Sequence, residues 1–255
     1  MHHRLLLCSK CDLLYANPIP SLEAIAGAYD DAAFDTGEEA HFAATTYAEV
    51  TKHVPVPDKV GALDIGTGDG AFLEELVALG FSNVCGVEPS AAPIAAARED
   101  IRPLIKHALF VPEDYPFARL SLITCFQTIE HLYEPLKICV DARPLLKTGG
   151  VLLVICHNRS SLVNRILGRK SPIFDVEHLQ LFNKKSVRRL LEEAGYQDIQ
   201  VAAIRNRYPL RYWMRLFPIP GGLKPRILAY LAKHRIGGIS LSLPVGNMAV
   251  FGVKR

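Results

Sequence analysis

The stretch Asp64-Ile65-Gly66-Thr67-Gly68-Asp69-Gly70 decides the fold of this 255-residue chain. It follows the short apolar run 60–63 and opens residues 71–77, whose apolar side chains recur at three- and four-residue spacing. Glycines in such a turn let the backbone bend tightly and let a ligand approach the main chain. Strand, glycine turn and helix in this order predict the first ligand-binding loop of an α/β sheet.

The residues around this loop limit which kind of ligand it can bind. A second strand-like run, 83–87, ends at Glu88, whose carboxylate can accept two hydrogen bonds from a ribose diol. The pattern D-x-G-x-G-x-G departs from the dinucleotide pattern G-x-G-x-x-G, because Ala71 occupies the place of its third glycine. Asp69 would also repel a pyrophosphate. The loop therefore favours a cationic nucleoside without phosphate, and S-adenosylmethionine has these properties.

Residues 60 to about 204 resemble a class I S-adenosylmethionine-dependent methyltransferase, in the subgroup of quinone-biosynthesis methyltransferases. The glycine stretch resembles that family's first motif. Four further motifs follow in the family's order: Val87-Glu88-Pro89-Ser90, Ile129-Glu130-His131-Leu132 with Pro135, Leu145-Leu146-Lys147-Thr148-Gly149-Gly150 before an apolar run, and His178-Leu179-Gln180-Leu181-Phe182 with Glu193-Ala194-Gly195-Tyr196.

Strand-like and helix-like segments alternate through the same region. We expect strands near 60–65, 83–88, 103–107, 120–126 and 149–156, with helices near 69–79, 91–100, 134–146, 160–168 and 184–195. Such alternation predicts a parallel sheet with helices on both faces. Residues 197–204 and 246–253 would add two strands, and the resemblance implies an antiparallel pair at the edge of a Rossmann-like, seven-stranded, mostly parallel sheet.

Three parts of the chain are expected. Residues 1–58 would form an N-terminal lead and helical cap, including a helix at 22–29, and residues 59–204 the S-adenosylmethionine-binding core. Residues 205–255 would form a basic C-terminal extension that ends in a sheet strand.

The resemblance implies a set of cofactor-binding residues. They are Asp64, Gly66, Thr67, Gly68, Gly70, Glu88, Glu113 and Gln127. Glu113 is the nearest acid in a region where Val111 replaces the acid usual in the family, and it has an alternative role as a solvated loop residue. Gln127 ends the fourth expected strand and faces the crevice, where main-chain groups 126–128 are an equal alternative.

Three histidines are candidates for a catalytic base: His178, His131 and His157. His131 follows Glu130 at a loop-to-helix junction, His157 ends the fifth expected strand, and His178 lies in the segment that covers the acceptor in the family. The ordinary pKa of histidine, near 6.5, suits a base for an acceptor hydroxyl at neutral pH. Each has the alternative of a structural, hydrogen-bonding histidine.

Six cysteines in a chain of this length favour a reducing compartment over a disulfide framework, and we expect a cytoplasmic protein. Cys8-x-x-Cys11 forms half of a zinc signature. Related methyltransferases carry a second pair upstream that this sequence lacks, so we predict no metal.

Charge is distributed unevenly. Residues 199–255 contain ten Lys and Arg and no Asp or Glu, which leaves 19 basic against 26 acidic residues in the rest. Tyrosines, leucines and a tryptophan interleave these charges, a pattern that favours an anionic or amphiphilic partner. We expect peripheral contact with an anionic membrane surface, and no specific nucleic acid because no recognised module accompanies the charge. The alternative is a basic lobe packed on the core.

The sequence thus predicts S-adenosylmethionine-dependent methyl transfer to a small-molecule, glycan or lipid-linked acceptor. One alternative is a small quinol or phenol as acceptor of an O- or C-methyltransferase. A catalytically silent nucleoside-binding module and a nicotinamide-dependent oxidoreductase are further alternatives, although the glycine spacing opposes the last.

Overall fold

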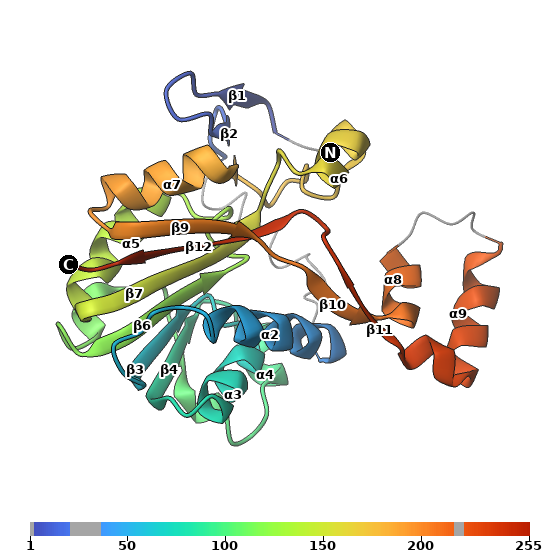
Figure 1. Cartoon of the computed structure of the whole chain (residues 1–255), viewed down its shortest axis with the longest axis horizontal. Helices are drawn as coiled ribbons and strands as arrows, with labels where there is room; N and C mark the ends of the chain where they lie inside the picture. The colour runs from blue at the N-terminus through green and yellow to red at the C-terminus, as the bar shows by residue number, and fades with distance from the viewer. Residues whose placement is uncertain (1–2, 21–36, 217–221) are drawn as a thin grey trace.

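The computed structural model describes residues 3–20, 37–216 and 222–255, and its centre is a seven-stranded sheet (Figure 1). The strand order is β5-β4-β3-β6-β7-β12-β9, and β12 runs antiparallel to both of its neighbours, whereas β3 to β7 pair in parallel. The bounds are β3 (Val60–Ile65), β4 (Ser82–Glu88), β5 (Ile105–His107), β6 (Leu120–Phe126), β7 (Leu146–His157), β9 (Gln197–Ala203) and β12 (Asn247–Val253). The predicted α/β fold, with its mostly parallel sheet of seven strands, is confirmed.

Helices cover both faces of the sheet, as predicted. In Figure 1, α2 (Glu38–Thr51), α3 (Ala71–Ala78) and α4 (Ala91–Ala96) lie on the lower face, and α5 (Pro135–Ala142) and α7 (Lys184–Glu193) lie on the other. The helix expected at 22–29 lies outside the described residues. Two expected elements are shorter than predicted because prolines start 3₁₀ turns. Pro103 delays β5 to Ile105, and Pro144 ends the helical run at Ala142.

Period-two alternation along the central strands builds two cores. On β7, Val151, Leu153 and Ile155 face one cluster, whereas Leu152 and Val154 face the other. Successive side chains of a strand point to opposite faces, so a strand buried on both faces reads as a continuous apolar run. This explains why β7 is apolar from Val151 to Cys156.

The sheet reverses direction of winding at β3, which lies between β4 and β6. Ligands of open α/β sheets bind beyond the carboxyl ends of the strands at such a switch point. The glycine stretch that follows β3, Glu88 at the end of β4, and the residues that follow β6 and β7 all lie at this edge.

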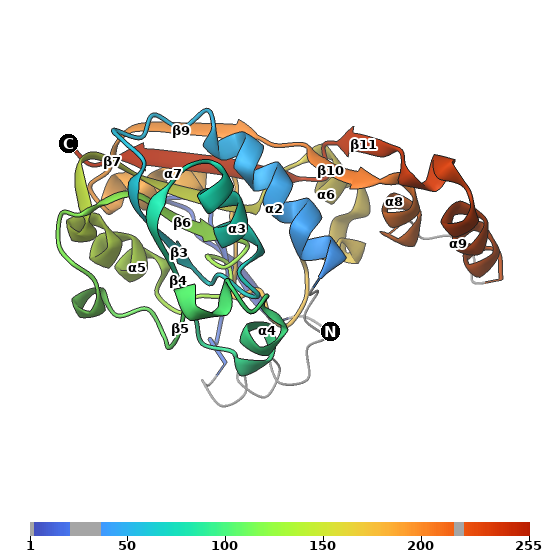
Figure 2. The ribbon, with the colours of Figure 1, turned by 90° about the horizontal axis from the view of Figure 1, so that it is seen from below.

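A second unit, which we call the arm, extends from one end of the sheet (Figures 1 and 2). It comprises residues 206–216 and 222–243: the antiparallel pair β10 (Asn206–Pro209) and β11 (Ser240–Leu243), with α8 (Leu210–Leu216) and α9 (Lys224–Lys233). Tyr208, Tyr212 and Trp213 form its small buried cluster. The arm contacts the core through α2, where Arg211 pairs with Glu38 and the rings of Phe42 and Tyr208 meet edge to face.

A small sheet that the sequence did not predict sits over the switch-point edge. It joins β1 (Leu5–Leu7), β2 (Leu14–Ala16) and β8 (Gln180–Leu181) in antiparallel pairs. Leu14 pairs with Leu181, so the N-terminal lead is bound to the segment that contains His178.

No helix among the described residues is both long and apolar enough to cross a bilayer.

Candidate active site

The glycine loop holds three positive backbone angles in five residues. Gly66 has a φ of 76°, and a Cβ at this position would lie 2.4 Å from the hydroxyl oxygen of Thr128. Gly70 has a φ of 77° at the N-cap of α3, where a Cβ would lie 2.6 Å from Ile101. Around Gly68, with a φ of 58°, a Cβ would meet nothing within 4 Å. Two glycines therefore serve the fold, while the third leaves open space beside the main chain.

Glu88 lies at the end of β4, directly beside this loop. Its side chain is buried, one carboxylate oxygen accepts the Gly68 N–H at 3.0 Å, and the other accepts the Ser90 N–H at 2.8 Å. Each carboxylate oxygen has a second lone pair that can accept a further hydrogen bond. A carboxylate fixed in this way beside the open space at Gly68 fits the ribose diol of S-adenosylmethionine.

Asp64 lies beneath the loop as a buried carboxylate. Thr124 donates a hydrogen bond to it at 2.6 Å, from the neighbouring strand β6. Burial raises the pKa of Asp64 to about 6, and the hydrogen bond from Thr124 and the nearby hydroxyl of Thr67 only partly oppose this effect. The charge of Glu88 adds to the rise. Asp64 thus supports the loop from below at a cost in stability when it is ionised.

This cost leads to a pH prediction for Asp64→Asn. Because the folded-state pKa is raised, the protonated carboxyl contributes stability that is complete below about pH 4 and lost as pH rises through about 6. The wild type should therefore gain about 1.4 kcal/mol from this residue between pH 8 and pH 5. Asparagine can still accept the Thr124 hydrogen bond but does not titrate. Urea denaturation of both proteins at pH 5 and pH 8 measures the difference, and equal pH dependence in both would refute the assignment.

The three remaining side chains of the predicted cofactor set differ in their surroundings. Thr67 is buried within the glycine loop. Gln127 follows β6 with a φ of 50°, and its N–H donates to the Ile155 carbonyl at 2.8 Å. Its side-chain oxygen is buried and has no hydrogen-bond partner among the described residues. Glu113 is exposed in the 3₁₀ turn Pro112–Asp114, and its role in adenine binding stays a prediction.

The three predicted histidines lie in one cluster around a buried acid. The ring centroids of His131 and His178 are 4.6 Å apart, and those of His157 and His178 are 5.2 Å apart. Glu130 accepts two hydrogen bonds on one carboxylate oxygen, from the main-chain N–H of His157 at 2.8 Å and from its Nδ1 at 2.9 Å. The cluster occupies the carboxyl ends of β6 and β7, next to the glycine loop.

A profile of the methyltransferase domain matches residues 32–201, which is about two thirds of the chain. The chain belongs to the methyltransferase family. Over 136 residues this methyltransferase is 29% identical to a probable S-adenosylmethionine-dependent methyltransferase of Mycolicibacterium smegmatis, covering 53% of this chain and 51% of the relative. It is 32% identical over 108 residues to a ubiquinone biosynthesis O-methyltransferase of Actinobacillus pleuropneumoniae, covering 38% of this chain and 46% of the relative. The chain spans about half the length of these curated relatives.

Solved structures share the fold of this methyltransferase. A methyltransferase from Archaeoglobus fulgidus superposes with a TM-score of 0.57 at 15% identity, covering 92% of this chain and all of that one. Phosphoethanolamine N-methyltransferase 2 of Haemonchus contortus was solved in complex with S-adenosyl-L-methionine. It superposes with a TM-score of 0.53 at 16% identity, covering 94% of this chain and 61% of that one. At these identities the likeness concerns the fold alone.

The members of the methyltransferase's histidine cluster differ in their protonation states. Burial would raise the pKa of Glu130, but the hydrogen bonds from His157 and the charges of the three histidines outweigh it and lower the pKa to about 2. Burial and the charge of His178 lower the pKa of His131 to about 4. Burial would also lower the pKa of His178, but Asp175, 2.8 Å from its Nδ1, and Glu130 outweigh burial and raise it. Glu130 is therefore ionised, His131 neutral and His178 biased toward its protonated form.

Exposure also separates the histidines. The side chain of His157 is 27% exposed, compared with 9% for His178. His131 is half-buried, and its Nδ1 lies 3.0 Å from the Glu177 carbonyl oxygen. His157 is thus the more accessible ring of the two that face a carboxylate.

Two acids at this site had no assigned role in the sequence. Glu130 belongs to a motif, yet the sequence pattern contains no sign that its carboxylate would bind His157, 27 residues later. Asp175 precedes His178 by three residues, and this short spacing was a usable signal for their contact. Both acids orient a histidine, and we count them among the site residues.

Glu130, His157 and His178 offer ligand atoms that all lie within 4.8 Å of one another, so these three residues could hold a metal ion. The prediction of no metal stays a prediction. All six cysteines are free thiols, and Cys8 and Cys11 are half-buried at the turn between β1 and β2.

Proposed function

We propose that this chain transfers a methyl group from S-adenosylmethionine to an acceptor hydroxyl placed beside His157. The observation that carries the proposal is the Glu130–His157 pair, at the same sheet edge as the glycine loop and Glu88. A cofactor site and a histidine oriented by a buried carboxylate are the two parts that such a transfer needs.

S-adenosylmethionine, when bound, supplies a methyl group already activated on its sulfonium. The residues of this chain therefore have to orient the acceptor, exclude water and accept a proton. Glu130 holds the proton of His157 on Nδ1, which leaves Nε2 as the atom that accepts the acceptor's proton. The carboxylate also stabilises the imidazolium that results. Placement of the acceptor oxygen in line with the methyl group contributes much of the rate.

Calorimetry tests the cofactor part of this proposal. We expect S-adenosylmethionine and S-adenosylhomocysteine to bind and NAD to show no measurable binding. Glu88→Ala should weaken S-adenosylhomocysteine by about 1.5–3 kcal/mol, the usual contribution of hydrogen bonds to a charged group. Glu192→Ala, an exposed change on α7, is the matched control, and Glu113→Ala separately measures the predicted adenine contact. Unchanged affinity in a folded Glu88→Ala protein removes Glu88 from the site.

For the acceptor, we favour an anionic glycan or a lipid-linked molecule reached at a membrane surface. The arm supports this choice, because Arg207, Arg226, Lys233 and Arg235 are all exposed on it. A quinol or phenol is the second candidate, and the relatives named as ubiquinone biosynthesis O-methyltransferases favour it. The free cysteines fit a reducing, cytoplasmic compartment.

The helix α6 (Leu162–Leu167) adds support for an amphiphilic surface. Its polar residue Asn164 is buried and hydrogen-bonded to Asn158 and Ser171, whereas Leu162 and Ile166 are 72% and 75% exposed. This orientation is the reverse of an ordinary surface helix. Figures 1 and 2 show α6 and the arm toward the same end of the long axis.

A further inference from the structure

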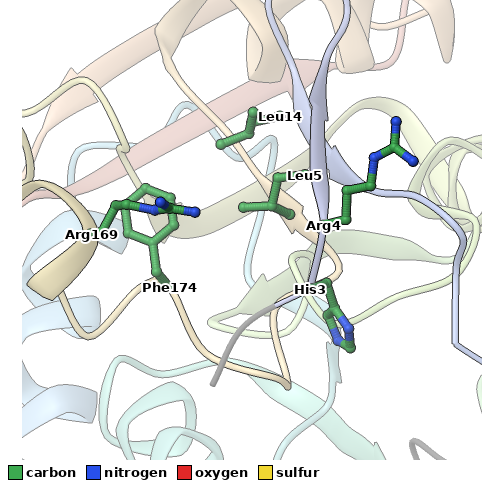
Figure 3. Close-up of a pocket in the computed structure, with 6 residues that line it drawn as sticks. All are labelled: His3, Arg4, Leu5, Leu14, Arg169 and Phe174. Carbon is green, nitrogen blue, oxygen red and sulfur yellow. The ribbon is translucent and has the colours of Figure 1, made fainter.

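A cavity of about 470 Å³ lies between the N-terminal strand and the segment that follows α6 (Figure 3). Figure 3 shows Arg169 and Phe174 facing Leu5 and Leu14, whereas the side chains of Arg4 and His3 lie on the other side of the strand. The lining residues are His3, Arg4, Leu5, Leu14, Arg169 and Phe174. Half of them are basic and half apolar, a lining suited to an apolar molecule that carries a negative charge.

The chain around this cavity is depleted of acids. Residues 1–11 and 157–174 contain no Asp or Glu, although they include Arg4, Lys10, Arg165, Arg169 and Lys170. The acids that end these two stretches are already paired. Asp12 forms an ion pair with Arg159 at 2.9 Å, and Asp175 lies 2.8 Å from His178. Both stretches therefore carry a surplus of positive charge.

The cavity and the histidine cluster share a wall. His3 Nε2 lies 2.7 Å from the carbonyl oxygen of Val176, two residues before His178, and two extended residues span at most about 7 Å. From the other side, Leu14 pairs with Leu181 in the small sheet. The N–H groups of Leu179 and Gln180 both donate to the Glu130 carbonyl. The segment 176–181 thus connects the residues that line the cavity with the main chain of Glu130.

We propose that this cavity binds the anionic end of the methyl acceptor, and that the acceptor is an apolar molecule bearing a phosphate or carboxylate. Arg169 binds the anion, because guanidinium groups bind phosphate and carboxylate with two parallel hydrogen bonds. Leu5, Leu14 and Phe174 pack against the apolar part. This assignment rests on the proposed methyl transfer beside His157.

The test is calorimetry of the full chain saturated with S-adenosylhomocysteine, with phenyl phosphate as probe and benzyl alcohol as its neutral counterpart. We expect phenyl phosphate to bind and benzyl alcohol to bind far more weakly. Arg169→Gln should reduce phenyl phosphate affinity about 10- to 100-fold. Arg165→Gln, an exposed change on α6 outside the cavity, should leave it unchanged.

A second arm identifies the source of the anion. Vesicles that contain phosphatidic acid, compared with vesicles of phosphatidylcholine alone, test a lipid phosphate. If Arg169→Gln abolishes capture by the phosphatidic acid vesicles, the site takes a lipid phosphate, whereas loss of phenyl phosphate binding alone indicates a soluble acceptor. If neither probe binds, or Arg169→Gln changes the binding of neither, the assignment is wrong. Failure of S-adenosylhomocysteine to bind would instead refute the proposed methyl transfer.

Discussion

Replacing His157 by alanine is expected to lower the rate of methyl transfer by about 10²- to 10⁴-fold, the usual contribution of a positioned general base. The expectation rests on the 2.9 Å contact between His157 Nδ1 and ionised Glu130, which leaves Nε2 for the acceptor. Because the contact between His157 and Glu130 does not involve the glycine loop, the affinity for S-adenosylhomocysteine should stay nearly constant. The rate is measured as transfer of labelled methyl groups from S-adenosylmethionine into acceptors of a cell extract.

Three comparisons separate this role from others. Glu130→Gln should also lower the rate and alter its pH profile, which loss of packing alone would not do. His178→Ala is the matched variant in the same cluster, and its effect should be smaller because Asp175 keeps His178 biased toward its protonated form. If His178→Ala lowers the rate more than His157→Ala does, His178 is the base instead. Loss of activity with a chelator, restored by one metal ion, would assign Glu130, His157 and His178 to a metal site instead.

The second large effect is expected at a membrane surface. Each basic residue near an anionic bilayer contributes about 1 kcal/mol, so serine at Arg207, Arg226, Lys233 and Arg235 should weaken vesicle binding about 10³-fold. All four side chains are exposed on the arm. Arg211 is left in place because its ion pair with Glu38 holds the arm to α2. Co-sedimentation with anionic vesicles at low salt measures the loss.

The matched control carries the same change in charge on the core. Serine at Lys52, Lys137, Arg189 and Arg255 removes four exposed cations whose surface ion pairs contribute little to stability. This protein should bind vesicles like the wild type, and raising the salt should release both, since screening shortens the attraction to about 8 Å at physiological ionic strength. If the two quadruple variants bind equally, the arm has no special role at the membrane.

The structure of the glycine loop and of the strands beside it was predictable because its signals are local. Gly66, Gly70 and Glu88 lie within one strand–turn–helix–strand unit, where backbone angles and strand ends follow directly from residue order. The rule that ligands gather at the carboxyl ends of parallel strands also places residues 127–131 and His157 near each other. What this rule does not determine is the choice of partners among the side chains.

The acceptor half depends on contacts between distant segments. Glu130 reaches His157 across neighbouring strands, and β2 finds β8 across about 165 residues of chain. Strands as short as these two carry no periodicity that a sequence pattern can detect. The arm was predicted as a basic segment from its charge, but the β10–β11 pair was not. The alternation of apolar and polar residues gives no signal for β11, because most of that strand is exposed.

The place of the arm in the chain has a consequence for how such proteins diversify. β9 and β12 are antiparallel neighbours, and the Ile204 N–H donates to the Asn247 carbonyl, so the arm occupies the position of an ordinary hairpin loop. Its two ends leave the sheet side by side, and loops are the positions where chains tolerate insertion best. A lineage could therefore exchange the whole arm for another, or for a tight turn, while the sheet closes as before. The arm would then evolve as a separate unit, independently of the part of the chain that binds the methyl donor.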